Sequence, residues 1–336
     1  MTTAGLRLAD SPFLADLGPG ERSLWRFVAT VAAGVAAYLL VTVVVFLAVV
    51  LLYVAVAGWP APTSLEGLKA LLRRFVELGA SDGRSFPDAM EIIGLGLTTN
   101  IAPMFAVIGL AALIHERPIR GLATTAPRFR WRMMAAGVAL WVVVVGPFLL
   151  VGQLMDPKAG PAPMLAVSTN PALCLIYALV CIAGFTPAAI GEEILFRGWL
   201  LRQTGNLTRN ILVLTVANGV IFSTAHLDFA PDAFLERAIM GAGFVYMTLR
   251  VGGVELSSGA HTANNLALVL FISPLTLKLT QTTGVSATSI AAYVGLFVAY
   301  VAMAELMVRW APLRRWAGAD QTLPPPPAIA AAAHFS

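Results

Sequence analysis

Two adjacent glutamates, Glu192 and Glu193, follow an uncharged stretch of 21 residues that begins at Pro171. Charged side chains inside a membrane-spanning helix are costly, so they usually serve a function. Arg197 lies four residues after Glu193 on the same helix face, whereas Glu192 points about 100° away. We expect Arg197 to neutralise Glu193 while Glu192 faces a cavity, where a desolvated carboxylate can accept a proton from water. A structural alternative is that the Glu–Arg pair only locks two helices together.

Two histidines lie in further polar clusters inside apolar runs. Phe222 and His226 are four residues apart, so their rings share one helix face. His261 and Asn265 have the same spacing and can aim two hydrogen-bond donors at one point, whereas Asn264 turns to a neighbouring face. Taken alone, each cluster fits a packed histidine or interhelical hydrogen bonding. The chain has four histidines and two of them lie in such clusters, which favours a shared site.

The composition indicates that these residues belong to a membrane protein. Of the 336 residues, 58% are hydrophobic and only 12% are charged, whereas globular proteins carry about 25% charged residues. A helix needs about 20 apolar residues to cross the hydrocarbon core. We therefore predict an all-α, polytopic helical membrane protein with about eight transmembrane helices and an intramembrane polar cavity. The expected spans are residues 27–57, 92–114, 133–155, 171–191 running on to 201, 210–227, 238–249 with an N-terminal extension, 256–277 and 279–304, with the last two divided near 273–288.

The distribution of arginines predicts the orientation. The connector 115–132 carries five arginines against one glutamate, which indicates the cytoplasmic side. An even number of spans then places both termini in the cytoplasm. The net charge of +4 fits basic loops on anionic lipid, and nothing indicates nucleic-acid binding. Long alanine and valine runs are compatible with a bacterial source, so we expect the bacterial inner (cell) membrane.

Four regions are expected along the chain. Residues 1–26 form a cytoplasmic N-terminal segment, and residues 27–170 form the N-terminal transmembrane helices. Residues 171–310 form the catalytic transmembrane core, because they contain all the polar clusters. Residues 311–336, which include four consecutive prolines and an alanine run, form a disordered cytoplasmic tail.

Helical rise gives the depth of each polar residue. Glu192 and His261 lie ten and eleven residues from the nearest arginine on the predicted cytoplasmic side, or roughly 15 Å. His226 lies seventeen residues from such an arginine, or about 25 Å. We expect a water-filled recess to resolve this difference, since irregular backbone is tolerated beside a cavity. Its expected lining is Asp228, Asp232, Glu236 and Arg237.

The three clusters together resemble a known family. Glu-Glu-x-x-x-Arg from Glu192 to Arg197, Phe-x-x-x-His ending at His226 and His-x-x-x-Asn ending at Asn265 follow one another on successive spans. This order resembles the CPBP family, which comprises the CAAX prenyl endopeptidases and the bacteriocin-processing or self-immunity membrane proteases. The resemblance covers about residues 171–309.

The resemblance implies a role for each matching residue. The implied catalytic residues are Glu192, His226, His261 and Asn265. Glu192 would be the general base, His226 would help to hold the attacking water, and His261 with Asn265 would stabilise the oxyanion. The supporting residues would be Glu193, Arg197 and Phe222, of which the first two set the position of Glu192.

A zinc site is the alternative to a metal-free glutamate mechanism. Its ligands would be Glu192, His226 and His261, with water in the fourth position. We favour no cofactor, because His261 has Asn265 rather than a carboxylate on its own face. The helix-borne zinc signature His-Glu-x-x-His is also absent from the sequence.

The predicted function is that of an intramembrane endopeptidase. It would hydrolyse a peptide bond near the C-terminus or in the membrane-proximal part of a protein or peptide, by glutamate-activated water. Its expected partners are membrane lipid and a lipidated or unlipidated protein or peptide. The alternative is a non-proteolytic membrane scaffold or bacteriocin-immunity protein that retains the pocket. A transporter is disfavoured, because the sequence shows no inverted repeat.

Overall fold

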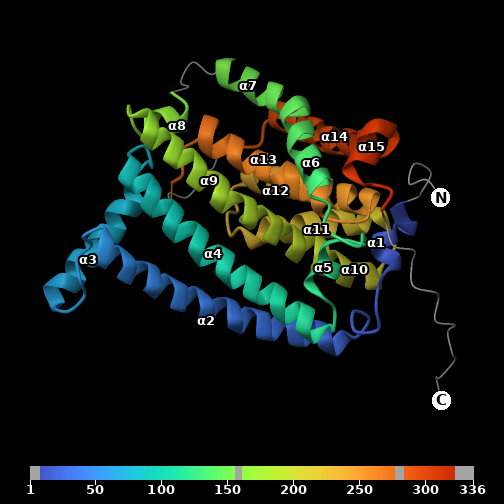
Figure 1. The fold of residues 1–336 in the computed structure, drawn as a ribbon, viewed down its shortest axis with the longest axis horizontal. Coiled ribbons are helices and arrows are strands. Elements are labelled where there is room, and N and C mark those ends of the chain that lie inside the picture. Colours follow the sequence, from blue (N-terminus) through green and yellow to red (C-terminus); the bar gives the residue numbers. More distant parts are fainter. Residues whose placement is uncertain (1–7, 156–160, 277–283, 322–336) are drawn as a thin grey trace.

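The computed structural model describes residues 8–155, 161–276 and 284–321. Over these ranges the protein is all-α, as predicted (Figure 1). Five helical segments are long and apolar enough to cross a membrane, which makes the chain a polytopic helical membrane protein. They are α2 (Leu24–Val56), α4 (Phe86–Ile114), α6 with α7 (Trp131–Leu154), the continuous segment Pro171–Leu207, and α14 (Ala287–Arg309).

The other three predicted runs also form helices, but these are shorter or more polar than the five. They are α11 (Ile211–Ala225), α12 (Pro231–Val251) and α13 (Glu255–Ala267), which continues into the π-helix η4 (Leu268–Ile272). The expected N-terminal extension of the run 238–249 is confirmed, since α12 begins at Pro231. Residues 277–283, where two predicted spans were to meet, lie outside the described residues.

Prolines explain two helix boundaries that apolar runs could not predict. The run 133–155 is divided into α6 (Trp131–Val144) and α7 (Gly146–Met155). Pro147 follows this division, and proline cannot donate the backbone hydrogen bond that would continue a helix. The π-helix η4 ends two residues before Pro274, because a residue before proline is driven out of helical geometry.

The C-terminal region is partly helical. Residues 311–336 were expected to be disordered, but Ala311–Ala317 form α15 with Ala317 buried. The expectation was wrong for this part because α15 packs against α6 and α14. Residues 322–336 lie outside the described residues.

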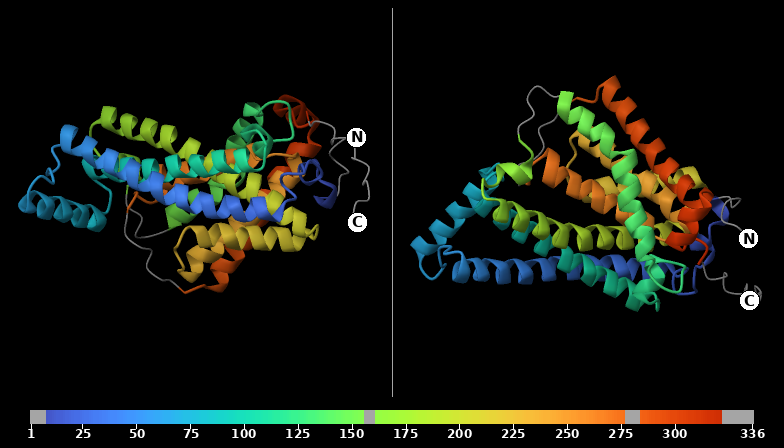
Figure 2. Two further views of the ribbon diagram at one scale, coloured as in Figure 1. Left: turned by 90° about the horizontal axis from the view of Figure 1, so that it is seen from below. Right: turned by 45° about the horizontal axis from the view of Figure 1, so that its top comes forward.

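The long helices are joined by a sequence of lateral contacts. α2 packs along α4, and α4 packs against α9 (Pro171–Glu192) (Figures 1 and 2). α9 contacts α13, which in turn packs on α6. α12 lies between α11 and α14. α2 and α4 therefore adjoin the predicted catalytic core through α9.

Short helices lie near the ends of the long ones. α3 (Leu65–Ala80), which is amphipathic, lies at the end of the molecule away from α1 (Pro12–Ala15) and α15 (Figure 1). The short helices are η2 (Leu8–Asp10), α1 (Pro12–Ala15), α3 (Leu65–Ala80), α5 (Ile119–Ala123), α8 (Pro163–Ala166), α10 (Leu201–Leu207) and α15.

The outer surface of α2 is strongly apolar. Leu39 and Leu40 are 61% and 65% exposed. Only 6% of the residues in the most apolar 18-residue stretch of this helix are buried. An exposed apolar surface of this extent is typical of contact with lipid. The exposure of α2 thus agrees with a membrane-spanning position.

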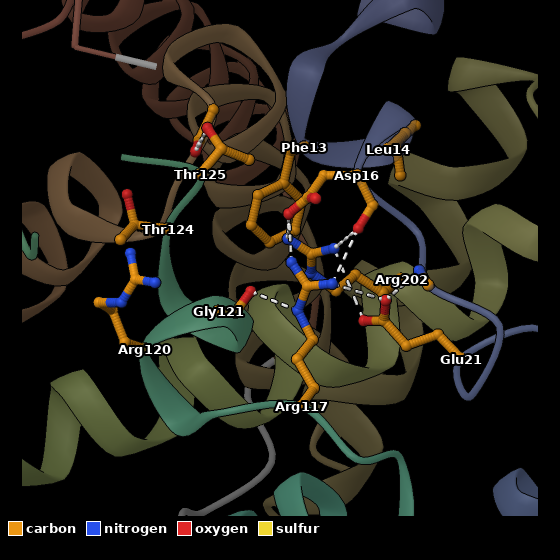
Figure 3. A network of polar contacts seen from close by, with 12 residues as sticks. Phe13, Leu14, Asp16, Glu21, Arg117, Arg120, Gly121, Thr124, Thr125 and Arg202 are labelled. Atoms are coloured by element: carbon orange, nitrogen blue, oxygen red, sulfur yellow. Dashed lines mark hydrogen bonds and ion pairs between the residues drawn. The ribbon is translucent and has the colours of Figure 1, made fainter. Parts of the chain in front are cut away.

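The N-terminal segment is fixed to the helices by a buried ionic network (Figure 3). Arg117 donates to Asp16 Oδ2 and, at 3.0 Å, to Glu21 Oε2. Arg202 donates to the backbone oxygen of Asp16 at 3.0 Å, and its guanidinium lies 4.1 Å from the centre of the Phe13 ring. Arg202 and Glu21 are almost completely buried. Two arginines and two carboxylates thus compensate one another away from water.

Candidate active site

Glu192 and Glu193 lie where a helix changes its winding. α9 ends at Glu192, and Glu193–Leu200 form the π-helix η3, which leads into α10. Pro187, inside α9, lies five residues before Glu192. Short π-helical segments frequently occur at functional sites. At this junction the Glu193 side chain is fully buried, whereas that of Glu192 is 26% exposed.

Arg197 neutralises Glu193, as the sequence predicts. Its NH1 donates to Glu193 Oε1 at 2.9 Å, and both side chains are fully buried. The guanidinium lies 4.0 Å from the centre of the Phe222 ring and 5.1 Å from that of Phe244, where cation–π attraction stabilises it. Gly241 leaves room for it, since a Cβ there would lie 3.2 Å from a guanidinium nitrogen.

His261 lies beside both glutamates. Its Nδ1 is 3.0 Å from Glu193 Oε1, so Nδ1–H donates to this carboxylate. Its Nε2 is 3.7 Å from Glu192 Oε2, which is too long for a hydrogen bond. The imidazole is buried. Contact between α13 and α9 therefore joins the first and third polar clusters of the sequence.

Phe222 connects the second cluster to the others. Its buried ring makes edge contacts with Phe196, His226 and His261, at centroid distances of 5.2, 4.7 and 5.9 Å. His226 follows the last residue of α11, and its Nδ1 lies 2.9 Å from the Phe222 carbonyl oxygen. Since a carbonyl only accepts, Nδ1 carries the proton, and Nε2 of the neutral ring can accept a hydrogen bond.

One cavity of about 700 Å³ brings together three of the four residues predicted to be catalytic. Glu192, His226 and Asn265 line it, whereas His261, which is buried behind Glu192, and Asn264 are not among its lining residues. The facing wall comes from α2 and α4. Its lining residues are Tyr38, Ile92, Ile93, Gly96, Leu97, Asn100 and Met104.

The recess expected around the start of α12 is not part of this cavity. Asp228, Asp232, Glu236 and Arg237 are absent from the lining, and Arg237 pairs with Asp228 at 2.9 Å. His226 lines the cavity itself, so no recess is needed.

Comparison with known proteins relates part of the chain to a family. Residues 169–267 match the family described as type II CAAX prenyl endopeptidase Rce1-like. The chain carries an Rce1-like domain. The uncharacterized protein YyaK of Bacillus subtilis (strain 168) is 28% identical over 184 residues, which cover 52% of this chain and 60% of YyaK. The match thus spans less than two thirds of this relative, and no solved structure matches the chain.

All the predicted site residues lie inside the Rce1-like domain. The cavity, however, extends beyond it, because α2 and α4 precede residue 169. Sequence reasoning missed Tyr38 and Asn100 on these helices. Each is a polar residue within an apolar run, which was the available signal. Phe244, which packs on His261 with a centroid distance of 5.3 Å, gave no such signal among the many apolar residues of the chain.

Among the described residues, no three His, Cys, Asp or Glu side chains are grouped closely enough to hold a metal ion. One argument against zinc was nevertheless wrong, because His261 does have a carboxylate partner in Glu193. Carboxylate–histidine pairs also occur behind metal-bound histidines. The metal-free site stays a prediction.

Proposed function

We propose that this chain is an intramembrane endopeptidase that uses a glutamate-activated water. The observation that carries the proposal is the single cavity lined by Glu192, His226 and Asn265 within an Rce1-like domain. A base, a water-holding group and an oxyanion donor on one cavity wall are the groups that peptide hydrolysis requires.

Glu192 is the general base. Its side chain lines the cavity and is 26% exposed, so the carboxylate can accept the proton of an attacking water there. His226 Nε2 accepts a hydrogen bond from the same water and orients it. Glu193 with Arg197 forms a neutral pair behind this position and fixes the backbone from which Glu192 projects.

His261 and Asn265 stabilise the oxyanion. His261 already donates Nδ1–H to Glu193, so it can donate from Nε2 only when the ring carries both protons. The positive charge of this ring then compensates the negative charge of the oxyanion. The Asn265 side-chain amide donates from the same cavity wall, one helical turn further along α13. Donors arranged in advance at the developing oxyanion lower the barrier by about 3–4 kcal/mol each.

The proposed membrane setting has eight transmembrane helices. In addition to the five long helices, α11, α12 and α13 with η4 cross the membrane as part of the packed core, which gives eight spans. Both termini lie in the cytoplasm of a bacterial cell, and the protein resides in the inner membrane. The substrate is a lipidated or unlipidated protein or peptide that is cleaved near its C-terminus or close to the membrane.

Activity is tested with a peptide library. The purified protein, in lipid nanodiscs, is incubated with lipidated and unlipidated C-terminal peptides, and the products are identified by mass spectrometry. We expect internal cleavage of at least one class of peptide by the wild-type protein and none by Glu192→Gln. If the wild-type protein cleaves no peptide, the chain is a non-proteolytic scaffold or immunity protein.

A further inference from the structure

The cavity has a second polar feature besides Glu192, His226 and Asn265. The Tyr38 hydroxyl on α2 donates to Asn100 Oδ1 on α4 at 3.0 Å, and Asn100 Nδ2 donates to the Gly96 backbone oxygen at 2.7 Å. Both side chains line the cavity together with Glu192. This pair lies outside the Rce1-like domain.

The rest of the facing wall offers no polar side chain. The other lining residues on α2 and α4 are Ile92, Ile93, Gly96, Leu97 and Met104. The pair also lies near the middle of two apolar helices, each residue being the fifteenth of its helix. Polar side chains at that depth are costly and usually serve a function. Helix packing alone explains the bond between them, but it does not use their remaining hydrogen-bonding groups.

The remaining hydrogen-bonding groups match one peptide unit. Asn100 Nδ2 has two N–H groups, and one of them bonds to Gly96. The Tyr38 hydroxyl uses its only proton on Asn100, and its oxygen can still accept. The pair therefore presents one N–H donor and one hydroxyl acceptor. A peptide unit carries one carbonyl acceptor and one N–H donor, and both need partners in an apolar cavity.

We propose that Tyr38 and Asn100 bind the backbone of the peptide substrate. Asn100 Nδ2–H donates to a substrate carbonyl, and the Tyr38 hydroxyl accepts from a substrate N–H. The peptide is thereby held between this pair and Glu192, which presents its scissile bond to the base. This assignment rests on the proposed proteolytic function, and it extends the site to two helices outside the Rce1-like domain.

Steady-state kinetics on Tyr38→Phe and Asn100→Leu test the site. The substrate is the library peptide that the wild-type protein cleaves. Loss of one neutral hydrogen bond should raise KM roughly 2- to 10-fold, with kcat nearly unchanged, because the contact exists equally in ground state and transition state. Thr98→Val is the matched control: Thr98 lies on α4, bonds to Gly94 and is not a lining residue of the cavity. Unchanged KM in both variants, with wild-type melting temperatures, overturns the proposal.

Substrates with a methylated backbone distinguish substrate binding by Tyr38 from a purely structural role of this residue. Each backbone N–H of the peptide is replaced in turn by N–CH₃. At one position methylation should raise KM for the wild-type and Thr98→Val proteins but cause no further increase for Tyr38→Phe. If methylation at every position has the same effect on all three proteins, the Tyr38 hydroxyl accepts no substrate N–H.

A binding experiment separates this inference from the proposed activity. The peptide library is passed over immobilised Glu192→Gln protein, and retained peptides are quantified by mass spectrometry. Retention should fall 2- to 10-fold when Tyr38→Phe is added and stay constant when Thr98→Val is added. That result supports the site even if the wild-type protein cleaves nothing. Equal retention by all the proteins, or no retention at all, contradicts it whether or not cleavage occurs.

Discussion

At the residue scale, two adjacent glutamates have different surroundings. Glu193 is completely buried and has two partners, Arg197 at 2.9 Å and His261 at 3.0 Å. Glu192 lines the cavity, and its Oε2 makes no hydrogen bond to any described residue. Helical geometry produces this difference, since successive side chains point about 100° apart. A cavity-lining carboxylate therefore adjoins a neutralised one.

Asn265 and Asn264 are adjacent residues that test the oxyanion assignment. Asn265→Ala should lower kcat by roughly 10²–10³, which is the usual loss for one oxyanion donor, with little change in KM. Asn264→Ala should have a much smaller effect, because Asn264 is not among the cavity-lining residues. Steady-state kinetics on both variants measure this. Equal losses, or a pure KM effect for Asn265→Ala, would indicate substrate binding or helix packing instead.

Glu193→Ala tests the buried pair. It leaves Arg197 without its only hydrogen-bonded carboxylate among the described residues. Removing one member of a buried ion pair typically costs about 3–5 kcal/mol, so both stability and activity should fall. Thermal unfolding in detergent measures the stability. A wild-type melting temperature would show that Arg197 does not depend on Glu193 for its charge balance.

At the element scale, the close crossing of α11 and α12 positions the side chains of Phe222 and Arg197. α11 and α12 approach each other at Gly219 and Gly241, whose Cα atoms are close enough that a Cβ on Gly241 would lie 3.0 Å from Gly219. Phe222 on α11 and Arg197 on η3 meet beside this crossing. The crossing therefore sets the distance between the second cluster and the glutamates.

Gly219→Ala should weaken this crossing. The added Cβ would lie 2.4 Å from the backbone oxygen of Ala238, so α11 and α12 must separate. Overpacking of this kind costs about 1–3 kcal/mol. Gly109→Ala on α4 is the control, because a Cβ there meets nothing within 4 Å. Melting temperatures should fall for the first variant only, and an equal change in both would contradict the packing argument.

Sequence periodicity predicts the positions of the helices better than it predicts their local geometry. Uncharged runs locate α2, α4, α9 and α14, because hydrophobic length determines a span. The i,i+4 spacing predicts the pair of Glu193 with Arg197. The π-helix η3 and the contact of His261 with Glu193 depend on packing between segments distant in sequence, so no local pattern signals them.

At the scale of the whole molecule, the site is completed by elements outside the Rce1-like domain. α2 and α4 supply the facing wall of the cavity. The N-terminal segment is joined to Arg202 at the start of α10, which continues the helix that carries Glu192. The sequence could not predict this attachment, because Asp16 and Glu21 resemble ordinary exposed charges until the fold pairs them with arginines and buries Glu21.

Glu21→Ala tests whether the N-terminal segment is part of the folded unit. The change leaves buried Arg202 and Arg117 with less countercharge, so unfolding should become easier by about 3–5 kcal/mol. Glu116→Ala is the control, since Glu116 is 74% exposed in its pair with Arg26. Exposed pairs contribute little. Equal melting temperatures for both variants would mean that the segment is attached only loosely.

The decisive measurement is the turnover of Glu192→Gln on the peptide that the wild-type protein cleaves, in the same nanodiscs. Glutamine keeps the shape of the side chain but cannot accept the proton of water, so the rate should fall by roughly 10²–10⁴-fold. Glu116→Gln, outside the cavity, should cleave at the wild-type rate, and both variants should melt as the wild type does. A folded Glu192→Gln protein with turnover within about tenfold of wild type would show that Glu192 is not the base.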